Sequence, residues 1–114
     1  MEIKTEQYRI CYDRETTTVS FSGSLRLTGP EEYQPIAKLL GEVVDGDAGK
    51  ITLNLQQLDF LNSSGISMLS KFIIQVRKKA GAKMVVQGSQ SVAWQAKSLK
   101  NLQRLMPALI LELL

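Results

Sequence analysis

The side chains best placed for chemistry are the two serine hydroxyls of the tetrapeptide Asn62-Ser63-Ser64-Gly65. Asparagine is a favoured N-cap residue, so this tetrapeptide predicts the start of a helix with both serines in its first turn. The free N–H groups and the positive end of the helix dipole would stabilise a phosphate on Ser63, which would add about 1.5 to 2 negative charges. The same tetrapeptide is also ordinary helix-start chemistry, which requires no function.

Composition excludes most other catalytic and metal-binding chemistry. The chain has no histidine and a single cysteine, Cys11, so it can form neither a Ser-His-Asp or Cys-His catalytic arrangement nor a zinc site. It also lacks the Walker A and G-x-G-x-x-G phosphate-binding patterns. We therefore expect a non-enzymatic binding module with no catalytic residue, no cofactor and no metal. Catalysis by carboxylates or lysine alone is the alternative that the composition leaves open.

Size and charge indicate one small domain. With 114 residues, 44% of them hydrophobic, the chain suits a single domain over residues 1–114 with one core. A net charge of +3 is too mild to indicate nucleic acid or a membrane surface, and no apolar run is long enough to cross a bilayer. The start of the chain, residues 1–6, has no signal-peptide pattern, and the lone cysteine suits a reducing compartment. We expect a cytoplasmic protein.

Hydrophobic spacing predicts alternating strands and helices. Alternation and β-branched residues indicate strands, apolar residues at three- and four-residue steps indicate helices, and glycine and proline mark their ends. Pro30 and Pro35 are expected in about the first turn of a helix, where proline is tolerated. We expect strands over 8–13 and 17–22, a helix over 30–46, a strand over 51–56, a helix over 63–80, a strand over 83–87, a helix over 91–106 and a strand over 108–114. This β-β-α-β-α-β-α-β order predicts the α/β class, with a mixed β-sheet and helices packed against it.

The predicted helix over 63–80 separates a core face from a solvent face. The core face is expected to contain Gly65, Ile66, Leu69, Phe72, Ile73 and Val76. The solvent face is expected to contain Ser63, Ser67, Ser70, Lys71, Ile74 and Lys78. Ile74 is therefore a predicted solvent-exposed apolar residue, about three turns from Ser63, and a candidate partner contact. Single exposed apolar residues are also common without any role.

Two features of the C-terminal half have less specific interpretations. Trp94 falls off the apolar stripe of its helix, so it is predicted to be exposed, either as a contact surface or as a cover for part of the sheet. Lys97, Lys100 and Arg104 share one helix face, and Arg77, Lys78, Lys79 and Lys83 lie at the end of the helix over 63–80. Cations near a helix C-terminus interact favourably with the dipole, so we interpret both groups as solvated surface.

The stretch Ile51–Ile66 resembles the signature of STAS domains, the family of bacterial anti-sigma factor antagonists. Its sequence, ITLNLQQLDFLNSSGI, is similar to the family pattern of a hydrophobic strand, a short connection and then Asp-Ser-Ser-Gly at the start of a helix. The predicted order of elements also matches the family fold, so the resemblance spans nearly the whole chain. It implies a single STAS-like domain that acts in signal transduction by binding other proteins.

The resemblance further implies a phosphorylation switch. In this family a partner serine kinase, often itself an anti-sigma factor, phosphorylates the first serine of the pair; this breaks the complex, and a metal-dependent serine phosphatase restores it. Carried over by position, the acceptor is Ser63. The implied partner-binding residues are Asn62, Ser64, Gly65, Ser67, Ile74 and Arg26, with Gly65 allowing close approach at the helix start. The implied role is that of a bacterial phosphoprotein in transcription regulation by partner switching.

The sequence departs from the family pattern at three places. Asn62 stands where an acidic residue usually precedes the serine pair, and Arg26 ends the motif at 23–26, where the family often has aspartate. Asn62 retains the capping function, and Arg26 would attract a phosphoserine if its loop lies close to Ser63. The final family helix is absent from this sequence, so we expect the end of the sheet to be less covered; a partner or a second copy, as in a homodimer, would cover it.

Two alternatives to the switch stay open. A degenerate STAS scaffold would bind a signalling partner constitutively, because a kinase that recognises the missing carboxylates would not accept this chain. A nucleotide-binding or nucleotide-hydrolysing domain is the alternative from another class. The absence of histidine and of a phosphate-binding loop argues against it.

Overall fold

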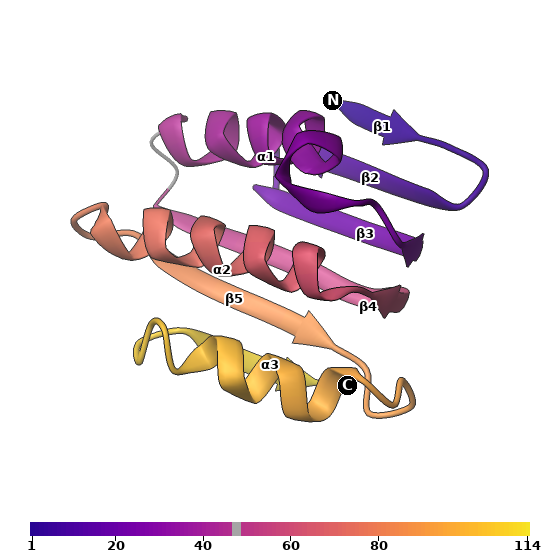
Figure 1. The fold of residues 1–114 in the computed structure, drawn as a ribbon. Helices are drawn as coiled ribbons and strands as arrows, with labels where there is room; N and C mark the ends of the chain where they lie inside the picture. The colour runs from indigo at the N-terminus through magenta and orange to yellow at the C-terminus, as the bar shows by residue number, and fades with distance from the viewer. Residues whose placement is uncertain (47–48) are drawn as a thin grey trace.

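A six-stranded sheet with three helices on one face is formed by residues 1–46 and 49–114, which the computed structural model describes (Figure 1). In chain order the elements are β1 (Glu2–Lys4), β2 (Tyr8–Asp13), β3 (Thr18–Leu25), α1 (Gly29–Asp45), β4 (Lys50–Leu61), α2 (Ser63–Lys78), β5 (Lys83–Gly88), α3 (Gln95–Gln103) and β6 (Ile110–Leu113). The predicted α/β class, the mixed sheet and the alternation of helices and strands after the hairpin are confirmed.

Each strand pairs with the next strand in the chain, so the sheet order is β1-β2-β3-β4-β5-β6. The first three strands are antiparallel, and β3 to β6 are parallel. Right-handed crossovers between parallel neighbours place α1, α2 and α3 on the same face, as Figure 1 shows. The carboxyl ends of β3 and β4 therefore meet at one edge of the sheet, and α1 and α2 both begin there.

The core lies between the helices and the sheet face that they cover. Its buried side chains include Val19, Phe21, Leu53, Leu55, Met84 and Val86 from the strands, and Tyr33, Ile36, Leu40, Leu69, Phe72 and Val76 from the helices. The alternate strand positions carry partly exposed polar side chains, among them Ser20, Ser22, Asn54 and Gln87. A sheet with one packed face and one solvated face shows this alternation. The uncovered face is thus polar, which lets the sheet stand without a second helical layer.

Gly23 lies where β3 passes closest to the start of the N-terminal hairpin. Its φ is +88°, and a side-chain carbon there would lie 2.2 Å from the carbonyl oxygen of Gln7. The register of β3 against β4 shifts between Gly23 and Ser24, and the Ser24 N–H donates to the same Gln7 carbonyl at 2.9 Å. Because glycine alone combines this φ with this approach, the structure explains the glycine of the motif at 23–26.

β3 and β4 extend beyond the expected boundaries, whereas β6, expected over 108–114, covers only Ile110–Leu113. β1 is missing from the sequence-based expectation because its short charged segment has no alternation; pairing with β2, with Ile3 opposite Ile10, stabilises it. β4 continues past Gln56 to Leu61, since its pairing with β3 is maintained through register shifts as far as Leu25 opposite Leu61. The segment that leads to Ser63 is therefore strand rather than a loose connection.

α2 and α3 are shorter than expected, whereas α1 has the expected length and lies one residue earlier. α2 ends at Lys78, because Lys79 has extended backbone with ψ of 115°. Before α3, residues 91–94 form turns, in which the Ser91 N–H bonds to the Ser89 hydroxyl at 3.1 Å. Pro35 lies in the second turn of α1, one turn later than expected. No helix in the described part of the chain is both long and apolar enough to cross a bilayer.

The side chain of Gln95, at the start of α3, completes the hydrogen bonding of β4. β4 pairs with β5 only as far as Asn54, so beyond that residue the edge of β4 that faces away from β3 has no neighbouring strand. Gln95 is 0% exposed, and its Nε2 donates to the carbonyls of Leu55 at 2.6 Å and Leu58 at 2.9 Å. Its Oε1 accepts the Ser89 N–H at 2.7 Å. One side chain thus replaces strand-to-strand hydrogen bonds and attaches α3 to the sheet.

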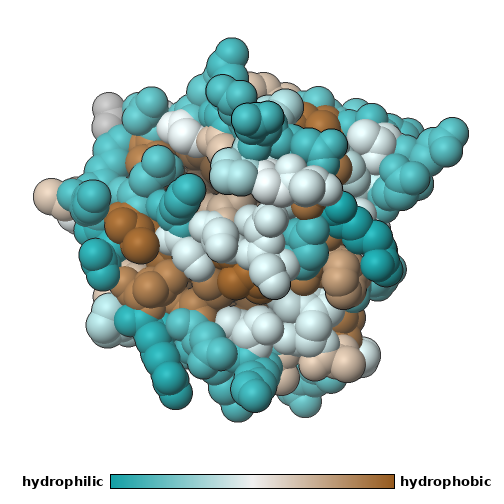
Figure 2. Space-filling view, viewed as in Figure 1, coloured by the Kyte–Doolittle hydropathy of each residue, from teal (hydrophilic) through white to brown (hydrophobic). Residues whose placement is uncertain are grey.

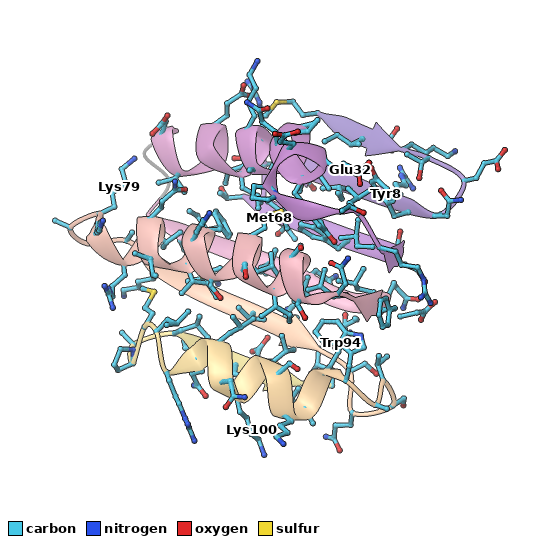
Figure 3. All side chains as sticks on the ribbon, viewed as in Figure 1. Tyr8, Glu32, Met68, Lys79, Trp94 and Lys100 are labelled. Carbon is cyan, nitrogen blue, oxygen red and sulfur yellow. The ribbon has the colours of Figure 1, made fainter. Side chains whose placement is uncertain are left out.

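Trp94 reinforces the same attachment and corrects a prediction. Its Nε1 donates to the Leu58 carbonyl at 3.1 Å, and its ring packs partly buried against the core (Figure 3). The prediction of an exposed Trp94 is wrong because residues 91–94 are turns, so the helical stripe from which Trp94 deviates does not exist there. Trp94 covers the end of β4.

We expect Gln95→Leu to lower the free energy of unfolding by about 2–4 kcal/mol, because each buried group left without a partner costs about 1–3 kcal/mol. Urea denaturation followed by circular dichroism measures this difference. Gln34→Leu, on the exposed side of α1, is the matched control and should stay within about 0.5 kcal/mol of wild type. A Gln95→Leu variant as stable as the control would show that these hydrogen bonds contribute nothing.

Candidate functional site

The side chain of Asn62 connects three segments at the start of α2. Its Oδ1 accepts the Gly65 N–H at 3.0 Å, which makes Asn62 the N-cap of the helix, and also the Tyr33 hydroxyl at 2.6 Å. Its Nδ2 donates to the Leu27 carbonyl at 2.7 Å. These bonds join α2 to α1 and to the β3–α1 connection. The helix start is therefore fixed by tertiary contacts as well as by its own capping.

The Asn62 hydrogen bonds explain why this chain has an amide where the resembled pattern has a carboxylate. The Gly65 N–H must meet an oxygen, so the NH₂ group faces the Leu27 carbonyl. An aspartate would place a second oxygen against that carbonyl and would have no hydrogen to donate. The departure at Asn62 is therefore matched to its surroundings.

Tyr33 and Gly65 set the close packing of α1 against the start of α2. Burial raises the pKa of the Tyr33 hydroxyl above its ordinary value; Tyr8 adds to the rise and the Leu27 backbone opposes it, so the hydroxyl keeps its proton for the bond to Asn62. A side-chain carbon at Gly65 would lie 2.2 Å from Leu61 Cδ1 and 2.8 Å from the Tyr33 hydroxyl. Gly65 is buried, and its lack of a side chain allows this approach.

The two serines at the helix start have different environments. Ser63 is exposed at the first position of α2, whereas Ser64 is half-buried. The first turn of α2 contains no acidic residue, so the positive end of the helix dipole is not neutralised there. Ser63 is thus the more accessible hydroxyl, and a phosphate on it would lie at the favourable end of the helix.

A cavity of about 400 Å³ lies between α1 and α2, beside the serines. Its lining comprises Pro30, Tyr33, Ala37, Leu40, Ser64, Ser67, Met68, Lys71, Phe72 and Gln75. Met68 marks its place between the two helices in Figure 3. The cavity is absent from the sequence-based expectations. The small side chains of Ala37 and Ser64 on facing helices are the feature that indicates such a gap.

Arg26 lies at the same edge of the sheet as Ser63 but has another contact. It follows the end of β3, and the Asn62 N–H donates to the carbonyl of its neighbour Leu25 at 3.3 Å. The Arg26 guanidinium lies over the Phe60 ring, with Cζ 4.2 Å from the ring centroid. This cation–π contact holds an exposed cation beside the helix start.

Of the other predicted partner-binding residues, Ser67 belongs to the site and Ile74 does not. Ser67 is exposed and lines the cavity one turn beyond Ser63. Ile74 lies about 16 Å further along α2 than Ser63 at 1.5 Å per residue. It is half-buried rather than exposed, because long side chains at neighbouring turns, such as Lys71 and Lys78, lie alongside it on the helix surface.

We expect Asn62→Asp to lower the free energy of unfolding at pH 7.5 by about 1–3 kcal/mol, because the Leu27 carbonyl loses its donor and faces a carboxylate. The helix dipole favours the new charge by only about 0.3–1 kcal/mol, so the loss is larger. Urea denaturation at pH 7.5 and at about pH 4 tests this. Part of the deficit should disappear at the lower pH, where a protonated carboxyl can donate again. Asn101→Asp, exposed on α3, is the control and should change stability by less than about 0.5 kcal/mol at either pH.

Solved structures with the same fold superpose on nearly the whole chain. A chain in the crystal structure of the diguanylate cyclase SiaD in complex with its activator SiaC, from Pseudomonas aeruginosa, is 12% identical with a TM-score of 0.74, over 100% of this chain and 99% of that chain. SiaC of Pseudomonas aeruginosa is 13% identical with a TM-score of 0.74, over 100% and 96%. An anti-sigma factor antagonist from Mycobacterium paratuberculosis is 19% identical with a TM-score of 0.68, over 95% and 90%. At these identities the likeness establishes a shared fold alone.

The sequence itself identifies the family. No curated protein sequence gives a significant match. The family profile of the STAS domain matches residues 17–105, a range that runs from the start of β3 to the end of α3 and contains the helix start at Asn62 and Ser63. This range covers most of the chain and agrees with the shared fold of the solved structures. The chain therefore belongs to the STAS domain family.

Proposed function

We propose that this protein is a non-enzymatic regulator that binds a protein partner through the start of α2 and releases it when Ser63 is phosphorylated. The observation that carries the proposal is the exposed Ser63 hydroxyl on a helix start fixed by Asn62. The adjoining cavity between α1 and α2 offers a recess for an apolar side chain of the partner. Rigid backbone, an exposed hydroxyl and a recess together suit a docking surface.

The switch follows from electrostatics and desolvation. A phosphate on Ser63 is tolerated in the free protein because the N–H groups and dipole of the helix start stabilise it. In the complex the same dianion must lose its water or approach negative groups of the partner, which costs free energy. A difference of about 3 kcal/mol lowers the affinity more than a hundredfold.

Proteins with this fold support a partner-binding role. SiaC occurs in complex with a diguanylate cyclase as its activator, and another structure of the same fold is an anti-sigma factor antagonist. By analogy, the proposed partners here are a serine kinase or anti-sigma factor and a serine phosphatase, in a bacterial pathway of transcription regulation located in the cytoplasm. Association of two copies of this chain is compatible with the same surface.

A constitutive scaffold is the second candidate function. It is favoured by Asn62 and Arg26, which stand where the resembled pattern has carboxylates that a kinase could recognise. Arg26 is also engaged with Phe60. The scaffold and the switch differ in one respect, because only the switch requires that a charge on Ser63 weakens binding.

Incubation with ATP and a cognate serine kinase should add the mass of one phosphate, located on Ser63 by tandem mass spectrometry. Ser63→Ala should prevent the modification, whereas Ser64→Ala should retain it, because Ser64 is half-buried against the cavity. Phosphate on another residue, or none with that kinase, would contradict Ser63 as the acceptor.

Ser63→Asp should lower affinity for a protein captured by the wild-type chain by about tenfold or more, since it places part of the phosphate charge at the docking surface. Isothermal titration calorimetry measures the two affinities. Ser91→Asp, exposed in the turns before α3, adds the same charge elsewhere and should leave affinity within about twofold. Equal binding by wild type and Ser63→Asp would support the scaffold instead.

A further inference from the structure

Charge is divided unevenly along the chain. Between Asp59 and Glu112 the sequence contains no aspartate or glutamate. The same segment contains eight basic residues, namely Lys71, Arg77, Lys78, Lys79, Lys83, Lys97, Lys100 and Arg104. Acidic residues outnumber basic residues before this segment. The charged side chains between Asp59 and Glu112 are therefore all positive. A surface with such charges attracts partners of opposite charge and orients them on approach.

Six of these cations lie on α2 and α3, which run side by side on the covered face of the sheet (Figure 1). They are Lys71, Arg77 and Lys78 on α2, Lys97 and Lys100 on α3, and Arg104 at the C-cap of α3, and all six are exposed. None of the six forms an ion pair with any residue in 1–46 or 49–114. Lys100 projects from the side of α3 away from α2 in Figure 3. The positive charge is therefore available to a partner.

An apolar band separates the cations of the two helices. Ile66 on α2 and Trp94 and Leu105 on either side of α3 are partly buried and pack on the core. Figure 2 shows hydrophobic surface between α2 and α3, with hydrophilic residues on both sides. Arg77 crosses this band, where its Nη1 donates to the Leu105 carbonyl at 2.9 Å. A partner that complements this surface would present a row of apolar side chains to the band and acidic side chains to the cations on both sides of it.

Neither nucleic acid nor a membrane complements this surface as well as a protein does. A phosphate backbone would match the cations but would leave the apolar band against charged oxygens. Membrane-surface binding needs apolar side chains that can leave the protein and enter the lipid, whereas Ile66, Trp94 and Leu105 are partly buried and packed on the core. Trp94 cannot do so, because its Nε1 is bonded to the Leu58 carbonyl and its ring is packed on the core.

We propose that the α2–α3 face, defined by Arg77, Lys78, Lys97, Lys100 and Arg104 with Ile66, Trp94 and Leu105, docks an acidic amphipathic helix of a protein partner. Lys71 lines the cavity on the α1 side of α2 and is not part of this face. An apolar stripe on that helix covers the band, and its flanking carboxylates meet the cations of α2 and α3. α1 exposes the carboxylates of Glu31, Glu32, Glu42 and Asp45. These negative charges would repel the acidic partner helix, so it docks beside α3 rather than beside α1. This inference deepens the proposed function by naming the chemistry of the partner, and it rests on that function only where it links the partner to Ser63.

The direct probe is a fluorescent synthetic peptide of three heptads, with leucine at two positions of each heptad and glutamate on both flanks. Anisotropy titration of the wild-type chain should show binding that is at least about tenfold tighter than for the same peptide with glutamine in place of glutamate. Raising the salt from about 50 to about 300 mM should weaken the glutamate peptide by about tenfold or more, because exposed charges are screened.

Two charge-reversed variants locate the interaction. Lys97→Glu/Lys100→Glu/Arg104→Glu should lower the affinity for the glutamate peptide by about tenfold or more. Lys4→Glu/Arg14→Glu/Lys50→Glu changes the net charge by the same amount at exposed positions outside the face, and should keep the affinity within about twofold. Circular dichroism verifies that both variants are folded.

The proposal is overturned if the glutamate and glutamine peptides bind alike, or if the two charge-reversed variants behave alike. Tighter binding of a twenty-base-pair DNA duplex or of phosphatidylglycerol vesicles than of the glutamate peptide overturns it in favour of those partners. The titration uses unmodified protein, so it gives the same result whether or not Ser63 is ever phosphorylated. Failure of the acidic-partner proposal and failure of the phosphorylation switch are therefore distinguishable.

Discussion

The hydrogen bonds of the Asn62 side chain are the interaction on which the site depends. One amide group accepts from α2 and α1 and donates to the connection between β3 and α1. This side chain links the edge of the sheet to the packing of α1 against α2. It thereby also fixes the position of Ser63, the next residue. A partly buried amide whose oxygen and nitrogen are both engaged has one arrangement that is better than its alternatives, and this gives the surface around Ser63 a defined shape in the absence of a partner.

Much of the fold could be predicted because burial imposes periodicity on sequence. The hairpin, the helices and the parallel strands each bury one face, and their apolar residues repeat accordingly. β1 could not be predicted, since its three residues depend on pairing with β2 rather than on their own pattern. The role of Gln95 was equally inaccessible. Its partners, the carbonyls of Leu55 and Leu58, are open to a side chain only because the pairing of β4 with β5 stops at Asn54, which is a property of the assembled sheet.

Some features of the candidate site could also be predicted from the sequence, whereas others could not. The N-cap and the first-turn serines follow from local chemistry, so the amino-acid sequence alone is enough to place Asn62, Ser63 and Ser64 at a helix start. The cavity could not be predicted, because it forms between two helices that are joined through β4. The exposure expected of Ile74 and Trp94 follows from helical projections that ignore neighbouring side chains and the true start of α3. Local sequence patterns are enough to predict where a helix begins. The exposure of each side chain depends on tertiary contacts, which these patterns do not contain.

The sequential strand order has a consequence for how the chain reaches this structure. No strand has to enter between two that are already paired, since each one joins the outer edge left by the strand before it. Partners therefore meet over short loops and single crossovers, which keeps the entropy of loop closure small. A chain leaving the ribosome can build the sheet in the order in which it is made. The side chains of Asn62 and Gln95 then bond back to segments made earlier, Asn62 to the Leu27 carbonyl after β3 and Gln95 to the carbonyls of Leu55 and Leu58 in β4.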